Sequence, residues 1–197
     1  MAQVLCVGMA TRDHIVLVEK YPAANERVIA IQSVNSFGGP ATTAAVTLAR
    51  LGVSVAVSCV IGDDEDGSSI MEMFKREGID TKHVVVDKLV RTASGTIVVS
   101  LSEQTRAIMV QPHAMRSAKP ADIGEYQWIH VDQFGMQTIN DWGIVRGGSA
   151  KLSIDIGYAT PGLNSSGLYF ANAGWAAMRR VTRSESAATW RSSAVAK

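Results

Sequence analysis

The order of apolar strands and amphipathic helices in the first 80 residues constrains the fold more than any other feature. Val4 to Val7 is a short continuous apolar run, as in a strand that is buried on both faces. Residues 41–51 predict a helix with a proline at its start and a glycine after its end, and 53–61 is strongly β-branched. Residues 68–77 carry apolar positions at helical spacing. This alternation favours a mostly parallel sheet with helices on its faces.

Several β-rich segments do not fit that sheet. They are 15–19, 28–34, 84–86, 96–101 and 106–110, and polar positions are interleaved in them. We expect them to form a separate small β-sheet, a lid over approximately 13–37 and 84–111, within an α/β unit of residues 1–170. The rest of that unit is expected to hold a helical turn at 122–126, a helix at 138–145, and strands at 127–131, 152–156 and 168–170.

The bulk composition narrows the classes of partner. The formal charge of +1 gives no electrostatic case for nucleic acid or a membrane surface, and no apolar run has the length of a membrane span. The N-terminus lacks the basic region of a signal peptide, so a cytoplasmic location is predicted. Cys6 and Cys59 lie in apolar runs without metal-ligand spacing, which indicates buried, reduced thiols and no metal site.

Residues 171–197 read as an atypical basic tail. From 178 to 197 the tail holds five cations against the single acid Glu185. A marginal surface helix and disorder are both open for this segment. A nucleic-acid-binding tail is disfavoured, because the cations are accompanied by one aromatic residue.

Three positions in the first half have the chemistry of a ligand site. Asp13 follows the first core strand, and a carboxylate there can accept hydrogen bonds from two neighbouring hydroxyls of a polyol. The alternative is a solvated turn residue. Gly38 and Gly39 permit a positive φ and a close approach of backbone to ligand, or form a plain turn or the hinge of a closing lid.

Two other segments have simpler explanations. The loop that contains Gly62, Asp63 and Asp64 does not fit the spacing of a calcium loop, and a helix N-cap cluster is favoured. Arg106 ends a predicted hairpin and, taken alone, is a surface cation.

Taken in order, these pieces resemble one family. They are Gly8 with Asp13, the run Gly-Gly-Pro-Ala-Thr-Thr at 38–43, Ala-Arg-Leu-Gly at 49–52, Ile-Gly-Asp-Asp at 61–64 with Gly67, Glu-Gly-Ile-Asp at 77–80, and Arg-Thr-x-Ser-Gly-Thr at 91–96. The motifs up to residue 80 resemble the first signature region of the ribokinase/PfkB carbohydrate kinases. The motif at 91–96, with Arg106 before the strand 108–110, resembles the hairpin that follows in the family, and the resemblance covers roughly residues 3–160. The Gly-Gly-Pro-Ala variant is similar to the bacterial branch that includes sulfofructose kinase and ketohexokinase-like enzymes.

The resemblance implies a Rossmann-like sheet with a β-lid that covers the sugar and often forms a homodimer. Asp13 would hold sugar hydroxyls, Gly38 and Gly39 would form a hinge beside the sugar, and Thr43 would stand where the family often has asparagine. Arg106 and Asn172 are further possible site residues. Members transfer the γ-phosphoryl group of ATP, with Mg²⁺, to a sugar hydroxyl.

The chain also departs from the family pattern. The family's Gly-Ala-Gly-Asp motif, which supplies the catalytic base and the anion hole, is absent, so no catalytic residue is assigned. Asn172 has Ala173 and Trp175 where the family has acidic neighbours linked to magnesium. We therefore expect a truncated kinase that does not bind ATP and Mg²⁺ productively and lacks turnover. The alternative is a pseudo-kinase that binds sugar or dimerises. A Rossmann dehydrogenase is excluded, because Gly8 is not followed by Gly-x-x-Gly.

Overall fold

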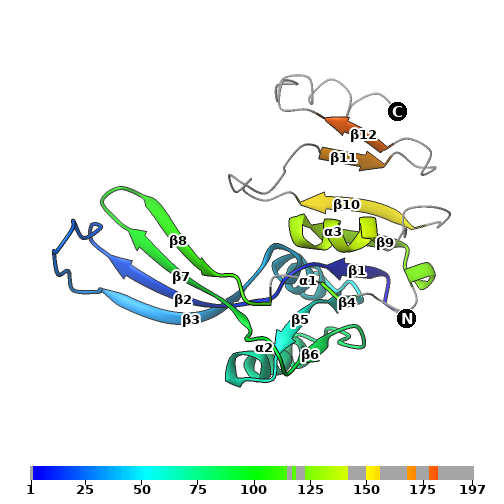
Figure 1. The fold of residues 1–197 in the computed structure, drawn as a ribbon, viewed down its shortest axis with the longest axis horizontal. Helices are drawn as coiled ribbons and strands as arrows, with labels where there is room; N and C mark the ends of the chain where they lie inside the picture. The colour runs from blue at the N-terminus through cyan, green and yellow to red at the C-terminus, as the bar shows by residue number, and fades with distance from the viewer. Residues whose placement is uncertain are drawn as a thin grey trace.

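The chain forms a core built on a parallel sheet and a lid built on a second sheet, which extends to one side of the core (Figure 1). The structure is a computed structural model, and it describes residues 2–114, 117–118, 123–141, 150–155, 168–171 and 178–181. None of the helices within these ranges is long and apolar enough to cross a membrane.

The core sheet has four parallel strands in the order β10-β9-β1-β4. Their bounds are Val4–Val7 for β1, Val55–Ser58 for β4, Trp128–Asp132 for β9 and Lys151–Asp155 for β10. Side chains alternate between the two faces of β1. Cys6 packs toward Ala45 and Phe74 of the helices on one face, whereas Leu5 and Val7 pack with residues of β9 on the other. This is the two-sided burial expected of a parallel sheet.

Three helices flank the sheet: α1 (Pro40–Arg50), α2 (Glu65–Arg76) and α3 (Gln133–Asp141). Pro40 occupies the first turn of α1, where its missing N–H costs nothing, and Gly52 follows the helix with a φ of 82°. Asp64 is the N-cap of α2, which also has acidic residues in its first turn and basic residues in its last, as the helix dipole favours. A 3₁₀ helix, η1 (Ile123–Glu125), precedes β9 and matches the expected helical turn.

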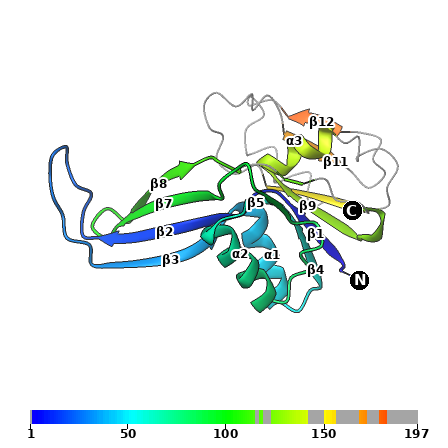
Figure 2. The ribbon, with the colours of Figure 1, turned by 60° about the horizontal axis from the view of Figure 1, so that its bottom comes forward.

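The lid has four strands in the order β3-β2-β7-β8. They are β2 (Thr11–Val18), β3 (Gln32–Gly38), β7 (Ala93–Ser100) and β8 (Thr105–Gln111). The central pair, β2 and β7, is parallel, and the outer strands pair antiparallel with it. Figure 2 shows this sheet projecting away from the helices and the core strands. The prediction of a Rossmann-like, mostly parallel α/β fold with flanking helices and a small β-sheet lid is confirmed.

One segment that we expected in the lid lies elsewhere. The β-branched run 84–86 falls in β6 (Val85–Asp87), which pairs in parallel with β5 (Val60–Gly62). A strand of three residues has too few positions to show which strand it pairs with, so its partner could not be deduced from β-propensity. The expectation that 84–86 joins the lid was therefore wrong.

Other bounds also differ from the expectation. Strand β3 covers Gln32–Gly38 instead of 28–34, and its polar first half is exposed at the edge of the lid. Helix α3 begins at Gln133, five residues before the expected start at 138, because the carboxylate of Asp132 accepts hydrogen bonds from its first turn.

Two short strands are described in the C-terminal segment. The expected strand at 168–170 is β11 (Leu168–Ala171), and it pairs antiparallel with β12 (Met178–Val181). For residues 178–181 we expected either a surface helix or disorder. They form a strand instead, so that expectation was wrong. The remainder of the basic tail lies outside the described residues.

Candidate functional site

A cleft of about 2040 Å³ lies between the lid, the start of α1 and the strands β9 and β10. Five side chains or backbone positions that the sequence singled out line this one cleft: Asp13, Gly38, Gly39, Thr43 and Arg106. They come from β2, β3, α1 and β8, which the chain order separates widely. The sixth candidate, Asn172, lies outside the described residues.

Asp13 is the third residue of the lid strand β2, and not a loop residue at the edge of the core sheet. It lies opposite Ser36 of β3 and Gly95 of β7. Its carboxylate fills space that two glycines leave free, because a Cβ on Gly38 would overlap Oδ2 and one on Gly95 would lie 2.8 Å from Oδ1. Burial raises the pKa of Asp13, while a hydrogen bond with Thr11 and the charge of Arg12 oppose the rise.

Gly38 and Gly39 are required for different reasons. Gly39 has a φ of 97°, and a Cβ there would overlap the carbonyl oxygen of Met9. A positive φ is thus confirmed at Gly39, and it allows the chain to turn from β3 into α1. Gly38 has no positive φ, and it needs to lack a side chain because the Asp13 carboxylate lies against it.

The two threonines at the start of α1 point in different directions. Thr42 is buried, and its hydroxyl donates a hydrogen bond of 3.0 Å to the carbonyl oxygen of Met9. Thr43 is exposed and lines the cleft. Of these two neighbours, Thr43 is therefore the one whose hydroxyl can reach a ligand.

Arg106 lies far along the lid from Asp13. It pairs with Val99 of β7, which in turn pairs with Leu17 of β2, four residues beyond Asp13. At about 3.3 Å per residue, this separation is roughly 13 Å. The cleft therefore brings Asp13, Gly38, Gly39 and Thr43 together, while Arg106 lies at the distal end of the lid face.

Asp132, at the end of β9, is a residue that the sequence analysis did not single out. It is fully buried, and its carboxylate accepts hydrogen bonds from the backbone N–H groups of Met9, Ala41, Phe134 and Gly135. Burial raises its pKa, and these four backbone hydrogen bonds oppose the rise. An acid directly after a core strand and before a helix was the available signal.

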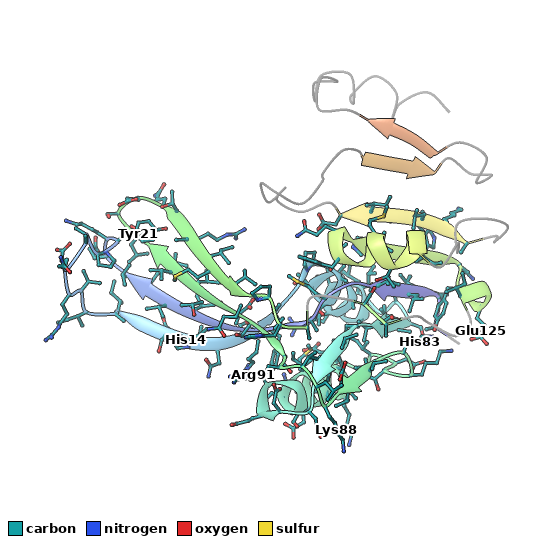
Figure 3. The ribbon with its side chains drawn as sticks, viewed as in Figure 1. His14, Tyr21, His83, Lys88, Arg91 and Glu125 are labelled. Atoms are coloured by element: carbon teal, nitrogen blue, oxygen red, sulfur yellow. The ribbon has the colours of Figure 1, made fainter. Side chains whose placement is uncertain are left out.

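The expected N-cap role of Asp64 is confirmed. Its Oδ1 accepts hydrogen bonds from Gly67 N at 2.8 Å and from the Thr92 hydroxyl at 2.6 Å, and its Oδ2 accepts one from Thr92 N. Burial alone would raise the pKa of Asp64, but the bonds from Thr92 and Gly67 and the charge of Arg91 lower it overall. Figure 3 shows Arg91 next to α2, where the chain passes into β7.

No group of residues suited to a metal ion occurs in the part of the chain that the structure describes. Cys6 and Cys59 are buried, free thiols, as expected, and burial together with the charge of Asp132 raises the pKa of each to about 12. They are therefore poor nucleophiles and poor metal ligands in this fold.

Comparison with known proteins gives the family context of this site. Residues 1–149 match the family described as pfkB family carbohydrate kinase. The chain is 31% identical over 121 residues to ribokinase of Bacillus subtilis (strain 168), a match that covers 61% of this chain and 41% of that protein. The chain spans less than half the length of each of the relatives compared with it by sequence.

Solved structures share the fold. Ribokinase from Cryptococcus neoformans var. grubii serotype A in complex with ADP has a TM-score of 0.66 at 18% identity and covers 78% of this chain, which covers 50% of that one. Fructokinase from Xylella fastidiosa has a TM-score of 0.66 at 20% identity, covering 84% of this chain and 55% of that one. At these identities the likeness shows the fold alone.

Proposed function

Because this chain belongs to the pfkB family of carbohydrate kinases, we propose that its cleft binds a small sugar under the lid. One observation carries the proposal: the partly buried Asp13 carboxylate lies against Gly38 and opens to the same cleft as Gly39 and Thr43. An ionised carboxylate accepts two hydrogen bonds at once, and vicinal sugar hydroxyls present two donors at a matching spacing.

Each neighbouring group has a part in this binding. The missing side chains at Gly38 and Gly95 let the sugar and the Asp13 carboxylate approach without a steric barrier. The hydroxyl of Thr43 both donates and accepts, so it complements a carboxylate that only accepts. Apolar side chains of the lid, such as Ile97 and Val110, also line the cleft and would cover the apolar face of a sugar ring.

The reaction of the whole protein would be transfer of the ATP γ-phosphoryl group to a sugar hydroxyl, as its family membership suggests. The 197 residues contain no Gly-x-Gly-Asp, so the chain supplies no base and anion hole of the kind that the family motif provides. We therefore propose that this polypeptide binds sugar without appreciable ATP turnover, as a truncated kinase or a pseudo-kinase would.

Calorimetric titration of the 197-residue protein with a panel of ribose, fructose, glucose and their analogues tests this proposal. We expect binding of at least one sugar at millimolar affinity or tighter, and ATP consumption that does not exceed a protein-free blank. Sustained, sugar-dependent ATP consumption would contradict the proposed lack of turnover. A folded protein that binds none of the sugars would contradict the proposed sugar site.

The lid also has a surface suited to a second copy of the chain. Asp13 and every second residue after it share one face of the lid, and this face continues with apolar side chains toward the lid tip. Two of them, in the row that contains Ile15, are unusually exposed for their type: Val34 at 49% and Ile108 at 50%. Contiguous exposed apolar side chains of this kind favour association, and we propose a homodimer through this face.

A further inference from the structure

The chain passes between the core and the lid at several points, which we call crossings. The carboxylate of Asp132 contacts two of these crossings. The first crossing passes through Met9 into β2, and the second passes from β3 through Gly39 into α1. Asp132 Oδ2 accepts a hydrogen bond of 2.9 Å from Met9 N and one of 3.3 Å from Ala41 N. The entry to the lid and the return from it are thus bound to the same atom, on a strand that belongs to the core.

The other oxygen of the same carboxylate is bound to the core itself. Asp132 Oδ1 accepts hydrogen bonds of 2.9 Å from Phe134 N and 2.8 Å from Gly135 N, at the start of α3. Gly39, the N-cap residue of α1, has no side chain that could accept a hydrogen bond from the first turn of the helix. Asp132 therefore caps α3 directly and stands in for the missing cap of α1 from a distant part of the chain.

The side chain of Asp132 is fully enclosed by its surroundings. Asp132 is 0% exposed, and a Cβ on Gly8 would overlap its carboxylate group. Thr42 donates a hydrogen bond to the Met9 carbonyl oxygen. The backbone N–H and C=O groups of Met9 are therefore both hydrogen-bonded. Asp132 does not line the cleft, whereas its partner Met9 does, as do Gly39 and Pro40, which precede its partner Ala41.

We propose that Asp132 is a positioning residue that fixes both crossings between the core and the lid and thereby holds Asp13 and Gly39 in the arrangement that binds the sugar. The inference deepens the proposed function and rests on it for the ligand, but the fixing of the crossings can be measured without any sugar.

Replacement by asparagine is the sharpest change, because it preserves the shape of the side chain. All four partners of Asp132 are N–H donors, and they need two acceptor atoms. Asparagine supplies one acceptor and one NH₂ donor, so one pair of backbone amides would face a donor. The hydrogen bonds of the α3 pair are 2.9 and 2.8 Å long, against 2.9 and 3.3 Å for the crossing pair, Met9 and Ala41. We therefore expect the NH₂ group to face Met9 and Ala41, which then lose their hydrogen bonds.

Residue-resolved amide hydrogen exchange on the wild-type chain is the first measurement. We expect the amides of Met9 and Ala41 to exchange as slowly as those of Leu5 and Val7 in the buried strand β1. In Asp132→Asn, and in Asp132→Ala, we expect exchange at Met9 and Ala41 to be faster by about tenfold or more. Unprotected amides at Met9 and Ala41 in the wild type would overturn the proposal, even if no variant folds.

Asp64→Asn is the matched control, because Asp64 also caps a helix and contacts a lid crossing, at Thr92. We expect this variant to speed exchange at Gly67 and Thr92 and to leave Met9 and Ala41 unchanged. Faster exchange at all four amides in both variants would reduce Asp132 to a general contributor to stability and would overturn its proposed role.

Gly8→Ala provides a second route to the same effect, because the added Cβ displaces the carboxylate. Since both changes act on one contact, the effect of Gly8→Ala on exchange at Met9 should largely vanish in an Asp132→Ala background. Additive effects of the two changes would contradict a shared mechanism.

Sugar titration then separates the inference from the proposed function. We expect Asp132→Asn to weaken sugar binding by about tenfold, and Asp64→Asn at a similar melting temperature to weaken it less. If the wild type binds no sugar while Asp132→Asn still loses protection at Met9, the proposed function fails and the fixing of the crossings stands. Full sugar affinity in a folded Asp132→Asn would overturn the positioning role.

Discussion

Gly95 lies directly opposite Asp13 in the parallel pairing of β7 with β2, and its missing side chain leaves the space that the Asp13 carboxylate occupies. A Cβ on Gly95 would be 2.8 Å from Asp13 Oδ1, closer than real Cβ contacts come. On the other side, in β3, Gly38 is a diagonal neighbour of Asp13, and a Cβ there would overlap Oδ2. Glycine on both neighbouring strands therefore determines where the carboxylate points, and Gly95 belongs to the candidate site together with Asp13.

Gly95→Ala should weaken sugar binding by about tenfold, because the Asp13 carboxylate must rotate or shift to make room for the methyl group. Calorimetric titration with a sugar that the wild type binds measures the effect. Gly124→Ala is the control, since a Cβ there has no neighbour within 4 Å. Unchanged affinity in Gly95→Ala, with a wild-type melting temperature, would show that the carboxylate position does not matter for binding.

The affinity for sugar should depend on the protonation of Asp13. Burial raises the pKa of this carboxyl above its ordinary value of 3.8. The carboxylate is the better acceptor, so affinity should be constant above the raised pKa and fall as the pH drops through it. The decline should therefore begin at a higher pH than for an ordinary aspartate, and Asp13→Asn should remove it.

Titrations across the acidic range, with circular dichroism at each pH to verify that the protein is folded, check this dependence. An affinity that stays constant down to a pH of 3.8 in the folded wild type would contradict it.

Thr92→Val should lower the free energy of unfolding by about 1–3 kcal/mol, because it leaves buried polar groups unpaired. The Thr92 hydroxyl donates a hydrogen bond to Asp64 and accepts one of 2.9 Å from Gly62 N. Valine removes both hydrogen bonds at once. The Asp64 carboxyl would then lose a cause of its lowered pKa. Its contribution to stability, present above the pKa of the unfolded state and lost as the pH falls through the folded-state pKa, should shrink.

Urea unfolding at neutral and acidic pH measures both effects of Thr92→Val. Thr47→Val is the control, because its hydroxyl is exposed and donates only to the carbonyl oxygen of Thr43 one turn earlier. Equal losses of stability in the two variants would contradict a special role for the network at Asp64.

Ile108→Glu should disrupt association of the chain, because Ile108 lies on the face of the lid that carries Asp13, through which we propose the homodimer. Met109→Glu is a matched control, because adjacent residues of β8 point to opposite faces of the lid and are similarly exposed, at 50% and 54%. Sedimentation velocity should give a dimer for the wild type and Met109→Glu and a monomer for Ile108→Glu. A wild type that is monomeric at high concentration would contradict the proposed dimer.

Local sequence signals predicted much of this fold. The helix after Pro40, the N-cap at Asp64 and the buried strand Val4–Val7 depend on neighbouring residues, and the structure has them where expected. The partners of short strands depend on residues far away in the chain. The run at 84–86 therefore resembled a lid strand, although it pairs with β5.

The same distinction applies to the site. Gly39 was found because a glycine pair before a helix indicates a turn. Asp13 was found because a carboxylate that follows a core strand is typical of a ligand site. The position of Asp132 after a core strand was a local signal. Its hydrogen bonds with the amides of Met9 and Ala41, more than 90 positions away, could not be deduced from neighbouring residues. Gly95 was seen only as part of a hairpin motif, since its pairing with Asp13 requires the register of β2 and β7.

Sugar binding by Asp13→Asn, measured by calorimetry beside the wild type, tests the sugar site most directly. The replacement preserves the size of the side chain but exchanges one acceptor oxygen for a donor, at a position enclosed by Gly38 and Gly95. We expect the wild type to bind at least one sugar of the panel and Asp13→Asn to lose most of that affinity while remaining folded. Equal sugar affinity in the two proteins would show that the ligand does not bind at this carboxylate.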